Sequence, residues 1–193
     1  AIDDITFMVP TLDIETADSL TEGNVATCPG PNNLVLTVSR NGSVPSTGIP
    51  FTFTTAAVTA TQGTDYTGYT NQPQTLLLGA TVSTIDLPIL CDDANEPNET
   101  FTVTISTVAG SGYFVLPGAA IGTGTITDDD SAPTIQVTSS TVNLSESGTA
   151  TFNVTLSGNP GGSTTFDIAS NDLGAATVSP SQLIFTTANF SAP

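Results

Sequence analysis

The 193-residue sequence has no histidine, lysine or tryptophan, and arginine occurs once, at Arg40. Without histidine or lysine, the sequence offers no clear pair of a nucleophilic side chain and a general base. A carboxylate pair such as Asp92 and Glu96 could suggest glycoside hydrolysis. A glycosidase cleft also needs aromatic side chains that bind the sugar, and the missing tryptophan argues against one. We therefore predict that the protein is not an enzyme.

Positive charge is almost absent, and this limits the possible partners. The chain carries 18 Asp and Glu residues and a formal net charge of −17. Nucleic-acid phosphates are bound by Lys and Arg, and anionic membrane surfaces attract the same residues. No apolar run reaches the length of about 18 residues that a membrane-spanning helix needs. We expect neither a nucleic-acid partner nor insertion into a membrane.

Cysteine is scarce as well, with Cys28 and Cys91 as the two copies. A pair fits one disulfide in an oxidising compartment, and two free buried thiols are the alternative. A zinc site would need more cysteines or histidines. The chain begins at Ala1 without a signal-peptide pattern, so we expect a processed or excised piece of an extracellular protein.

Apolar residues alternate with polar residues along the whole chain. β-branched residues fill the intervening positions, and Gly, Pro, Asn and Asp separate the segments. This period of two is typical of antiparallel strands with one buried face, and turns about every ten residues indicate a β-sandwich. We therefore predict an all-β fold. The clearest alternating positions are Leu34, Leu36 and Val38; Phe51 and Phe53; Phe101, Val103 and Ile105; and Phe152, Val154 and Leu156.

An internal repeat suggests the domain organisation. The segment 10–14 (PTLDI) matches 133–137 (PTIQV), and 20–22 (LTE) matches 144–146 (LSE) at nearly the same distance. Acidic residues precede the proline of each copy. We predict three parts, namely the tail of a preceding unit at 1–9, a complete sandwich at 10–130 and a second unit at 131–193.

The second predicted unit is shorter than the first and has room for about five strands. A sandwich needs its closing strands to cover the core and protect the sheet edges. Three explanations remain open at this point. The chain is part of a longer array, or a partner donates the missing strand, or the second unit forms a smaller sheet.

Nine acidic residues gather in four short clusters: Glu22; Asp65; Asp92, Asp93, Glu96 and Glu99; and Asp128, Asp129 and Asp130. Two negative charges about 4 Å apart repel by about 1 kcal/mol in water and by more in a drier site. If the fold brings the clusters together, a hard cation must join them, and carboxylate oxygens suit calcium. If it keeps them apart, they are solvated acids of loops.

The order of these motifs resembles the Calx-β domain. The matching stretches are 63–66 (GTDY), 96–101 (EPNETF) and 126–130 (ITDDD), and residues 134–193 resemble the start of a related repeat of large bacterial surface proteins. The resemblance implies tandem immunoglobulin-like sandwiches of about seven strands and calcium at the junction with the next domain. The implied ligands are Glu22, Asp65, Asp92, Glu96, Glu99 and Asp128 to Asp130. The family's acidic pair falls at Cys91 and Asp92, so Asp93 lies one place late.

The resemblance implies a non-catalytic calcium-binding module of an extracellular array, such as a stalk or an adhesin on a bacterial cell surface. Calcium would fix the angle between consecutive domains, because a metal bound only by the ordered state stabilises that state. Neighbouring domains of the array would be its partners. Two alternatives are a module that recognises a surface glycan or protein, and a filament subunit whose second unit accepts a strand from a partner chain.

Overall fold

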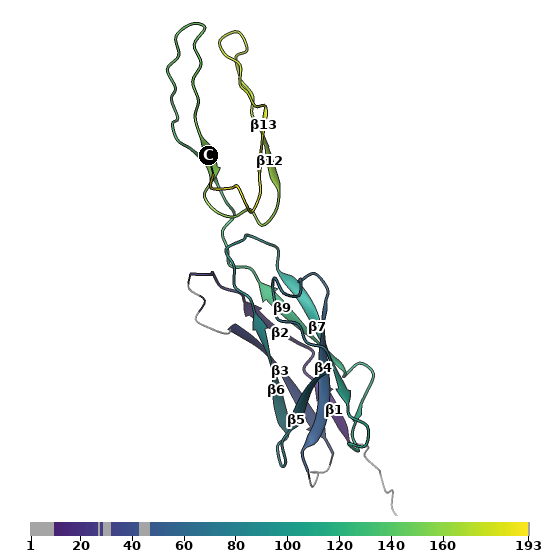
Figure 1. Cartoon of the computed structure of the whole chain (residues 1–193). Coiled ribbons are helices and arrows are strands. Elements are labelled where there is room, and N and C mark those ends of the chain that lie inside the picture. The colour runs from purple at the N-terminus through teal and green to yellow at the C-terminus, as the bar shows by residue number, and fades with distance from the viewer. Residues whose placement is uncertain (1–9, 27, 29–31, 43–46, 193) are drawn as a thin grey trace, which may run out of the picture. The chain divides into compact units, whose positions relative to one another are not determined.

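The computed structural model describes residues 10–26, 28, 32–42 and 47–192, and all regular secondary structure of these residues is β-strand (Figure 1). They form two compact units. The first unit comprises the described residues up to Cys91 together with Asn98–Asp128, and the second comprises Asp92–Pro97 and the residues from Asp129 on. The predicted tail 1–9 lies outside the described residues, and the assignment of 10–130 and 131–193 as separate domains stays a prediction. No helix long and apolar enough to cross a membrane occurs in the described part.

The first unit is a sandwich of two sheets (Figure 1). One sheet has the order β6-β3-β1-β8 and the other β2-β9-β7-β4-β5. Most neighbours are antiparallel, as predicted, but β1 pairs with β8 and β2 pairs with β9 in parallel. The strands are β1 (Thr11–Ile14), β2 (Ala17–Thr21), β3 (Asn32–Asn41), β4 (Ile49–Ala57), β5 (Gln72–Leu76), β6 (Val82–Ile89), β7 (Glu99–Thr107), β8 (Phe114–Val115) and β9 (Ile121–Thr127).

The core of the first unit lies between these sheets, and the alternating apolar residues supply it. Successive side chains of a strand point to opposite faces, so every second residue faces the opposing sheet. On β7 the inward positions are Phe101, Val103 and Ile105, all at most 1% exposed. The all-β sandwich predicted from the alternation is confirmed. The same pattern buries Leu34, Leu36, Val38, Phe51 and Phe53.

An aromatic stack occupies the core where β7 begins. The rings of Phe101 and Tyr66 lie nearly parallel, with centroids 4.3 Å apart and an interplanar angle of 11°. Gly124 of β9 lies directly opposite Phe101 in the ladder. A Cβ at Gly124 would lie 2.5 Å from Cζ of Phe101, so the absence of a side chain on β9 makes room for the ring.

We expect Gly124→Ala to lower the free energy of unfolding by about 1–3 kcal/mol, the usual range when a packed core must accept an extra methyl group. The added carbon would push the Phe101 ring, which cannot move freely because Tyr66 covers its face. Urea unfolding of the two proteins measures the change. Thr125→Ala on the same strand is the control, because Thr125 is only half-buried. An equal loss in both variants would contradict the packing argument.

The second unit has four strands where about five were predicted: β10 (Ile135–Val137), β11 (Val154–Leu156), β12 (Thr164–Asp167) and β13 (Gln182–Phe185). They form two separate antiparallel pairs, β10-β11 and β12-β13. Leu156 and Phe185 are buried, and Phe185 meets Phe166 edge to face at 5.8 Å. Most other apolar side chains of this unit are exposed, so its pairs do not enclose a core like that of the first unit.

Candidate metal centre

Four predicted ligands lie at one end of the first unit, three of them where strands begin or end and the fourth in a turn. Glu22 directly follows β2, and its N–H donates to the Thr127 carbonyl at the end of β9 (3.1 Å). Glu99 opens β7 and pairs with Ile126 of β9. Asp128 directly follows β9. Parallel pairing of β2 with β9 brings the ends of both strands to the same edge.

The fourth ligand, Asp65, lies in the GTDY segment, where a tight turn fixes its position. The Asp65 N–H donates to the Thr61 carbonyl (3.0 Å), and the Asp65 carboxylate accepts a hydrogen bond from the Thr61 N–H. The Asp65 carbonyl accepts from the Leu90 N–H (2.9 Å), which ties the turn to the end of β6. Asp65 is only 4% exposed. Its carboxylate is therefore held in a defined position before any ion arrives.

Tyr66, next to Asp65, is part of the core and not of the polar site. Burial raises the pKa of its phenol; the Thr55 hydroxyl lowers this pKa, and the negative charge of Asp65 raises it again. A raised pKa keeps the phenol protonated at neutral pH. Tyr66 thus anchors the turn by stacking on Phe101 and supplies no negative charge.

The predicted disulfide between Cys28 and Cys91 is confirmed, with Cα atoms 6.2 Å apart. The bond joins Cys28, which lies after β2, to Cys91, which directly precedes Asp92. Gly23 lies close to the bond, since a Cβ there would be 3.9 Å from the Cys91 sulfur. The disulfide therefore fixes the backbone next to Glu22.

Other predicted ligands belong to the second unit, where backbone and amide contacts order the segments that carry them. The Asp92 carboxylate accepts from the Ala94 N–H (2.7 Å). The Asn95 side-chain amide donates to the Asp130 carbonyl (3.1 Å). These contacts place the loop 92–97 beside the segment that begins at Asp129.

Among the residues described, each unit holds one pair of predicted ligands that lie close enough to share a metal ion. In the first unit, carboxylate oxygens of Asp65 and Glu99 lie within 4.8 Å of each other, and in the second unit those of Asp92 and Asp130 do so. Asp93, Asp128 and Asp129 join neither pair. Whether each residue is a ligand stays a prediction.

The donor chemistry fits a hard divalent cation. Glu22 and Asp65 are each 4% exposed, and burying a carboxylate is costly unless a counter-charge is present. Arg40 cannot supply that charge, because its guanidinium donates to the carbonyls of Ala80 (2.7 Å) and Gly42 (2.9 Å). Carboxylate oxygens without sulfur or imidazole are the donor set that calcium takes.

Two asparagines of the acidic loop were not among the predicted site residues. Asn98 accepts a hydrogen bond from the Asp128 N–H through its side-chain oxygen (3.1 Å), and Asn95 donates to the Asp130 carbonyl (3.1 Å). Both lie between predicted ligands in sequence. An asparagine next to a cluster of acids in the sequence is a signal for such a site, because its amide can hold the backbone of the cluster without adding charge.

Comparison with known proteins gives one family and several solved structures of similar fold. The sequence profile of the Calx-beta domain matches residues 30–130 and again 128–184. A crystal structure of the apo form of the Calx CBD1 domain is similar with a TM-score of 0.52 and 22% identity, covering 64% of this chain and 100% of that one. Among the curated proteins no match is found.

Two further solved structures extend this similarity of fold. CBD12 from CALX1.2 has a TM-score of 0.52, and the structure named calcium binding domain CBD12 of CALX1.1 has 0.51, each at 22% identity. Each covers 62% of this chain, which in turn spans 44% of theirs.

Proposed function

The chain belongs to the Calx-beta domain family, and on this premise we propose that it is a non-catalytic calcium-binding module of an extracellular array. One observation carries the proposal. Glu22 and Asp65 are buried carboxylates of the first unit, and carboxylate oxygens of Asp65 and Glu99 lie close enough together to share a metal ion. The structure named calcium binding domain CBD12 of CALX1.1 shares this fold, which supports calcium as the ion.

In the proposed mechanism, Asp65 and Glu99 of the first unit would bind one calcium ion, and Asp92 and Asp130 of the second unit would bind another. The ion would add positive charge beside these carboxylates. Acids that repel one another in the free protein would then attract a common centre. Asp128, Asp129 and Asp130 directly follow β9, so we propose that calcium also restrains this linker and makes the array rigid.

Two features support the extracellular part of the proposal. Disulfides such as Cys28–Cys91 persist in oxidising compartments and are rare in the cytosol. A calcium site tuned to extracellular concentrations can bind with a dissociation constant of about 10⁻⁴–10⁻³ M. We propose a role as a structural segment of a cell-surface stalk or adhesin, with neighbouring domains of the array as partners.

Thermal unfolding with calcium and with a chelator tests the metal proposal. At a calcium concentration 100 times the dissociation constant, one site stabilises the folded state by about 2.7 kcal/mol. We expect the melting temperature to rise with calcium and to rise less with magnesium, which prefers a smaller octahedral site and keeps its waters. Equal effects of calcium and magnesium would contradict a dedicated calcium site.

Matched variants make the test specific to the site. Glu99→Gln removes one charge from the Asp65 group, and we expect it to reduce the calcium-dependent rise in melting temperature. Asp86→Asn removes one charge from an exposed position of β6 and should leave the rise unchanged. If both variants lose the rise equally, the acids act through overall charge and not as ligands.

Small-angle X-ray scattering tests the linker proposal separately. We expect calcium to narrow the distribution of maximum dimensions of the 193-residue chain and a chelator to broaden it. Calcium-dependent stabilisation without any change in scattering would keep the metal sites and reject the rigid junction.

A further inference from the structure

A small groove opens in the first unit beside the edge strands of its two sheets. It has a volume of about 200 Å³ and is lined by residues of β4, β5 and β6 and of the segment before β5. β5 and β6 are the outermost strands of their sheets, so the groove lies on the side of the sandwich where neither sheet continues in the described residues. Its aromatic and polar lining residues are Phe53, Tyr69, Gln72, Gln74 and Asp86.

Two aromatic rings line the groove in a fixed arrangement. The rings of Phe53 and Tyr69 meet edge to face with centroids 5.3 Å apart. Phe53 is only 6% exposed, whereas Tyr69 is half-buried. The Tyr69 N–H donates to the Thr55 hydroxyl (2.8 Å), and the Thr55 N–H donates to the Tyr69 carbonyl (2.9 Å). Tyr69 is therefore held by β4 and keeps part of its side chain accessible to a ligand.

Oxygen atoms that accept hydrogen bonds lie beside these rings. The exposed Asp86 contributes its carboxylate from β6. The Gln74 side-chain amide donates to the Thr84 carbonyl (2.9 Å), which fixes this amide and leaves its oxygen as the group that accepts from a ligand. Gln72 adds a second amide. A ligand in the groove thus meets aromatic rings, one negative charge and amide oxygens.

This combination fits a guanidinium group better than a neutral ligand. A cation is attracted to the negative face of an aromatic ring. The planar guanidinium of arginine stacks on such rings, and its N–H groups donate to carboxylate and amide oxygens. The formal net charge of −17 also draws cations towards the chain. A neutral sugar would gain nothing from this charge.

The single arginine of the sequence is engaged elsewhere and does not fill the groove. The Arg40 guanidinium donates to the carbonyls of Ala80 (2.7 Å) and Gly42 (2.9 Å). The 193 residues contain no lysine. A second copy would have to break these hydrogen bonds to offer Arg40, which disfavours a copy of this chain as the source of the cation.

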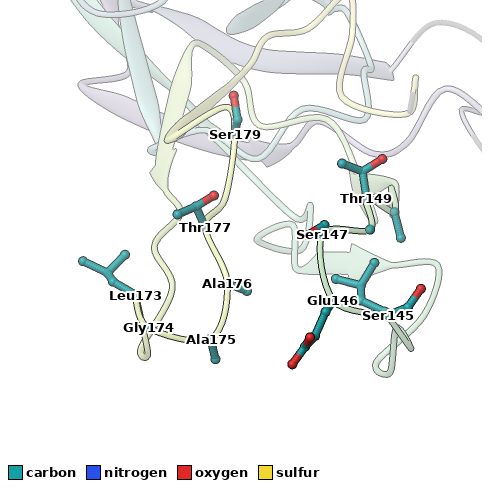
Figure 2. A pocket seen from close by; sticks show the side chains of 13 residues that line it. Ser145, Glu146, Ser147, Thr149, Leu173, Gly174, Ala175, Ala176, Thr177 and Ser179 are labelled. Atoms are coloured by element: carbon teal, nitrogen blue, oxygen red, sulfur yellow. The ribbon is translucent and has the colours of Figure 1, made fainter.

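A larger groove in the second unit has a different chemistry. It has a volume of about 690 Å³ and lies between residues 144–150 and 173–179. Figure 2 shows short side chains on both loops, such as Thr149 and Thr177, and the single acid Glu146. Its lining residues, all in the described part of the chain, include no aromatic ring. The smaller groove is therefore the one that combines a ring with a carboxylate.

We propose that the groove beside β5 and β6 binds an arginine side chain of a partner polypeptide. The guanidinium stacks on the Tyr69 ring and donates to the Asp86 carboxylate and the Gln74 oxygen. The apolar stem of the arginine packs against Pro73, which also lines the groove. None of the nine predicted metal ligands lines it, so binding does not depend on calcium.

The tripeptide acetyl-glycyl-arginyl-glycine amide is the probe, added to the 193-residue chain in chelator and in calcium. We expect saturable changes in the NMR amide shifts of Tyr69, Gln72 and Gln74, with the same affinity in both conditions. The same peptide with citrulline in place of arginine keeps the shape without the charge. It should bind about tenfold more weakly, because it loses both the cation–ring attraction and the ion pair.

Matched variants locate the site. Asp86→Asn should weaken binding of the arginine peptide by about threefold to fivefold. Glu15→Gln removes one charge from an exposed residue that does not line the groove, and it should leave the affinity unchanged. Tyr69→Leu should weaken binding, whereas Tyr69→Phe, which keeps the ring, should not. Urea unfolding of each variant verifies that the first unit remains folded.

The outcomes are distinct from those of the calcium experiments. Absence of saturable shifts, or equal binding of the citrulline peptide, would overturn the proposal whether or not calcium stabilises the chain. Equal losses in Asp86→Asn and Glu15→Gln would reduce the effect to net charge and also overturn the site. If guanidinium chloride alone binds the groove as tightly as the peptide, a free organic cation replaces the polypeptide partner.

Discussion

Replacing Phe101 with alanine should lower the free energy of unfolding of the first unit by about 3–5 kcal/mol, the range for truncating a buried phenylalanine. Phe101 is fully buried and stacks on Tyr66 at 4.3 Å. Since Gly124 lies opposite and has no side chain, nothing on β9 can fill the space that the ring leaves. The cavity should therefore persist instead of collapsing, which places the loss towards the upper part of this range.

The same change should also weaken calcium binding. Glu99 and Phe101 lie two residues apart on β7 and so point to the same face. Tyr66, which follows Asp65, loses its stacking partner in the variant. Both Asp65 and Glu99 then lose a rigid support, and positioned ligands depend on such support. We therefore expect Phe101→Ala to lower both the calcium-dependent rise in melting temperature and the free energy of unfolding in chelator.

Urea unfolding in chelator and in calcium separates the two effects. Phe101→Leu is the graded variant, because it keeps most of the apolar volume and should lose less in both measurements. Thr102→Ala, at the neighbouring half-buried position, is the control. A loss below about 1 kcal/mol for Phe101→Ala would mean that the site relaxes around the cavity, which contradicts the role assigned to Gly124.

The strands could be predicted from the sequence because their signal is local. Alternation at Phe101, Val103 and Ile105 marks a strand with one buried face, and the structure buries all three. The parallel pairing of β2 with β9 carries no such signal. Ala17 and Thr123 are neighbours in that ladder although more than 100 residues separate them in the chain. Pairings of this kind depend on the whole sandwich and not on the segment.

The sequence predicts which types of residue form the candidate site, but not which individual acids take part in it. The GTDY motif contains Asp65, and the turn there holds the Asp65 carboxylate through the Thr61 N–H, whereas its role as a metal ligand stays a prediction. The run at Asp128, Asp129 and Asp130 offered three equivalent acids, of which Asp130 joins a group. Which one does so depends on the direction of the backbone after β9. Asn98 accepts from the Asp128 N–H, and Asn95 donates to the Asp130 carbonyl.

In the second unit, the alternating sequence pattern is longer than the strand that forms. Phe152, Val154 and Leu156 alternate as regularly as the residues of β7, yet the strand covers only Val154–Leu156. A two-stranded pair is marginal by itself, and a strand lengthens when a second neighbour satisfies its other edge. The sequence can therefore predict the capacity to form a strand, while pairing with neighbouring strands decides the length of that strand.

Removing the disulfide should have an effect as large as truncating the core. The bond between Cys28 and Cys91 spans a sequence separation of 63 residues. The chain-entropy model gives about 4 kcal/mol for closing a loop of this length. We expect the double variant Cys28→Ser with Cys91→Ser to lose this amount in chelator, as measured by urea unfolding. The intact protein treated with a reducing agent should behave in the same way.

Calcium should reveal a second contribution of the disulfide. Glu22 and Asp92 flank the bond in sequence, and Gly23 lies close to the Cys91 sulfur, so its loss frees the backbone on which one acidic group depends. Asp65 is held by Thr61 and Leu90 and should keep its position. Calcium-dependent stabilisation should therefore fall in the double variant and fall further when Glu99→Gln is added. If the double variant keeps the full calcium effect, the disulfide stabilises the fold alone, and the position of Glu22 comes from its contact with β9.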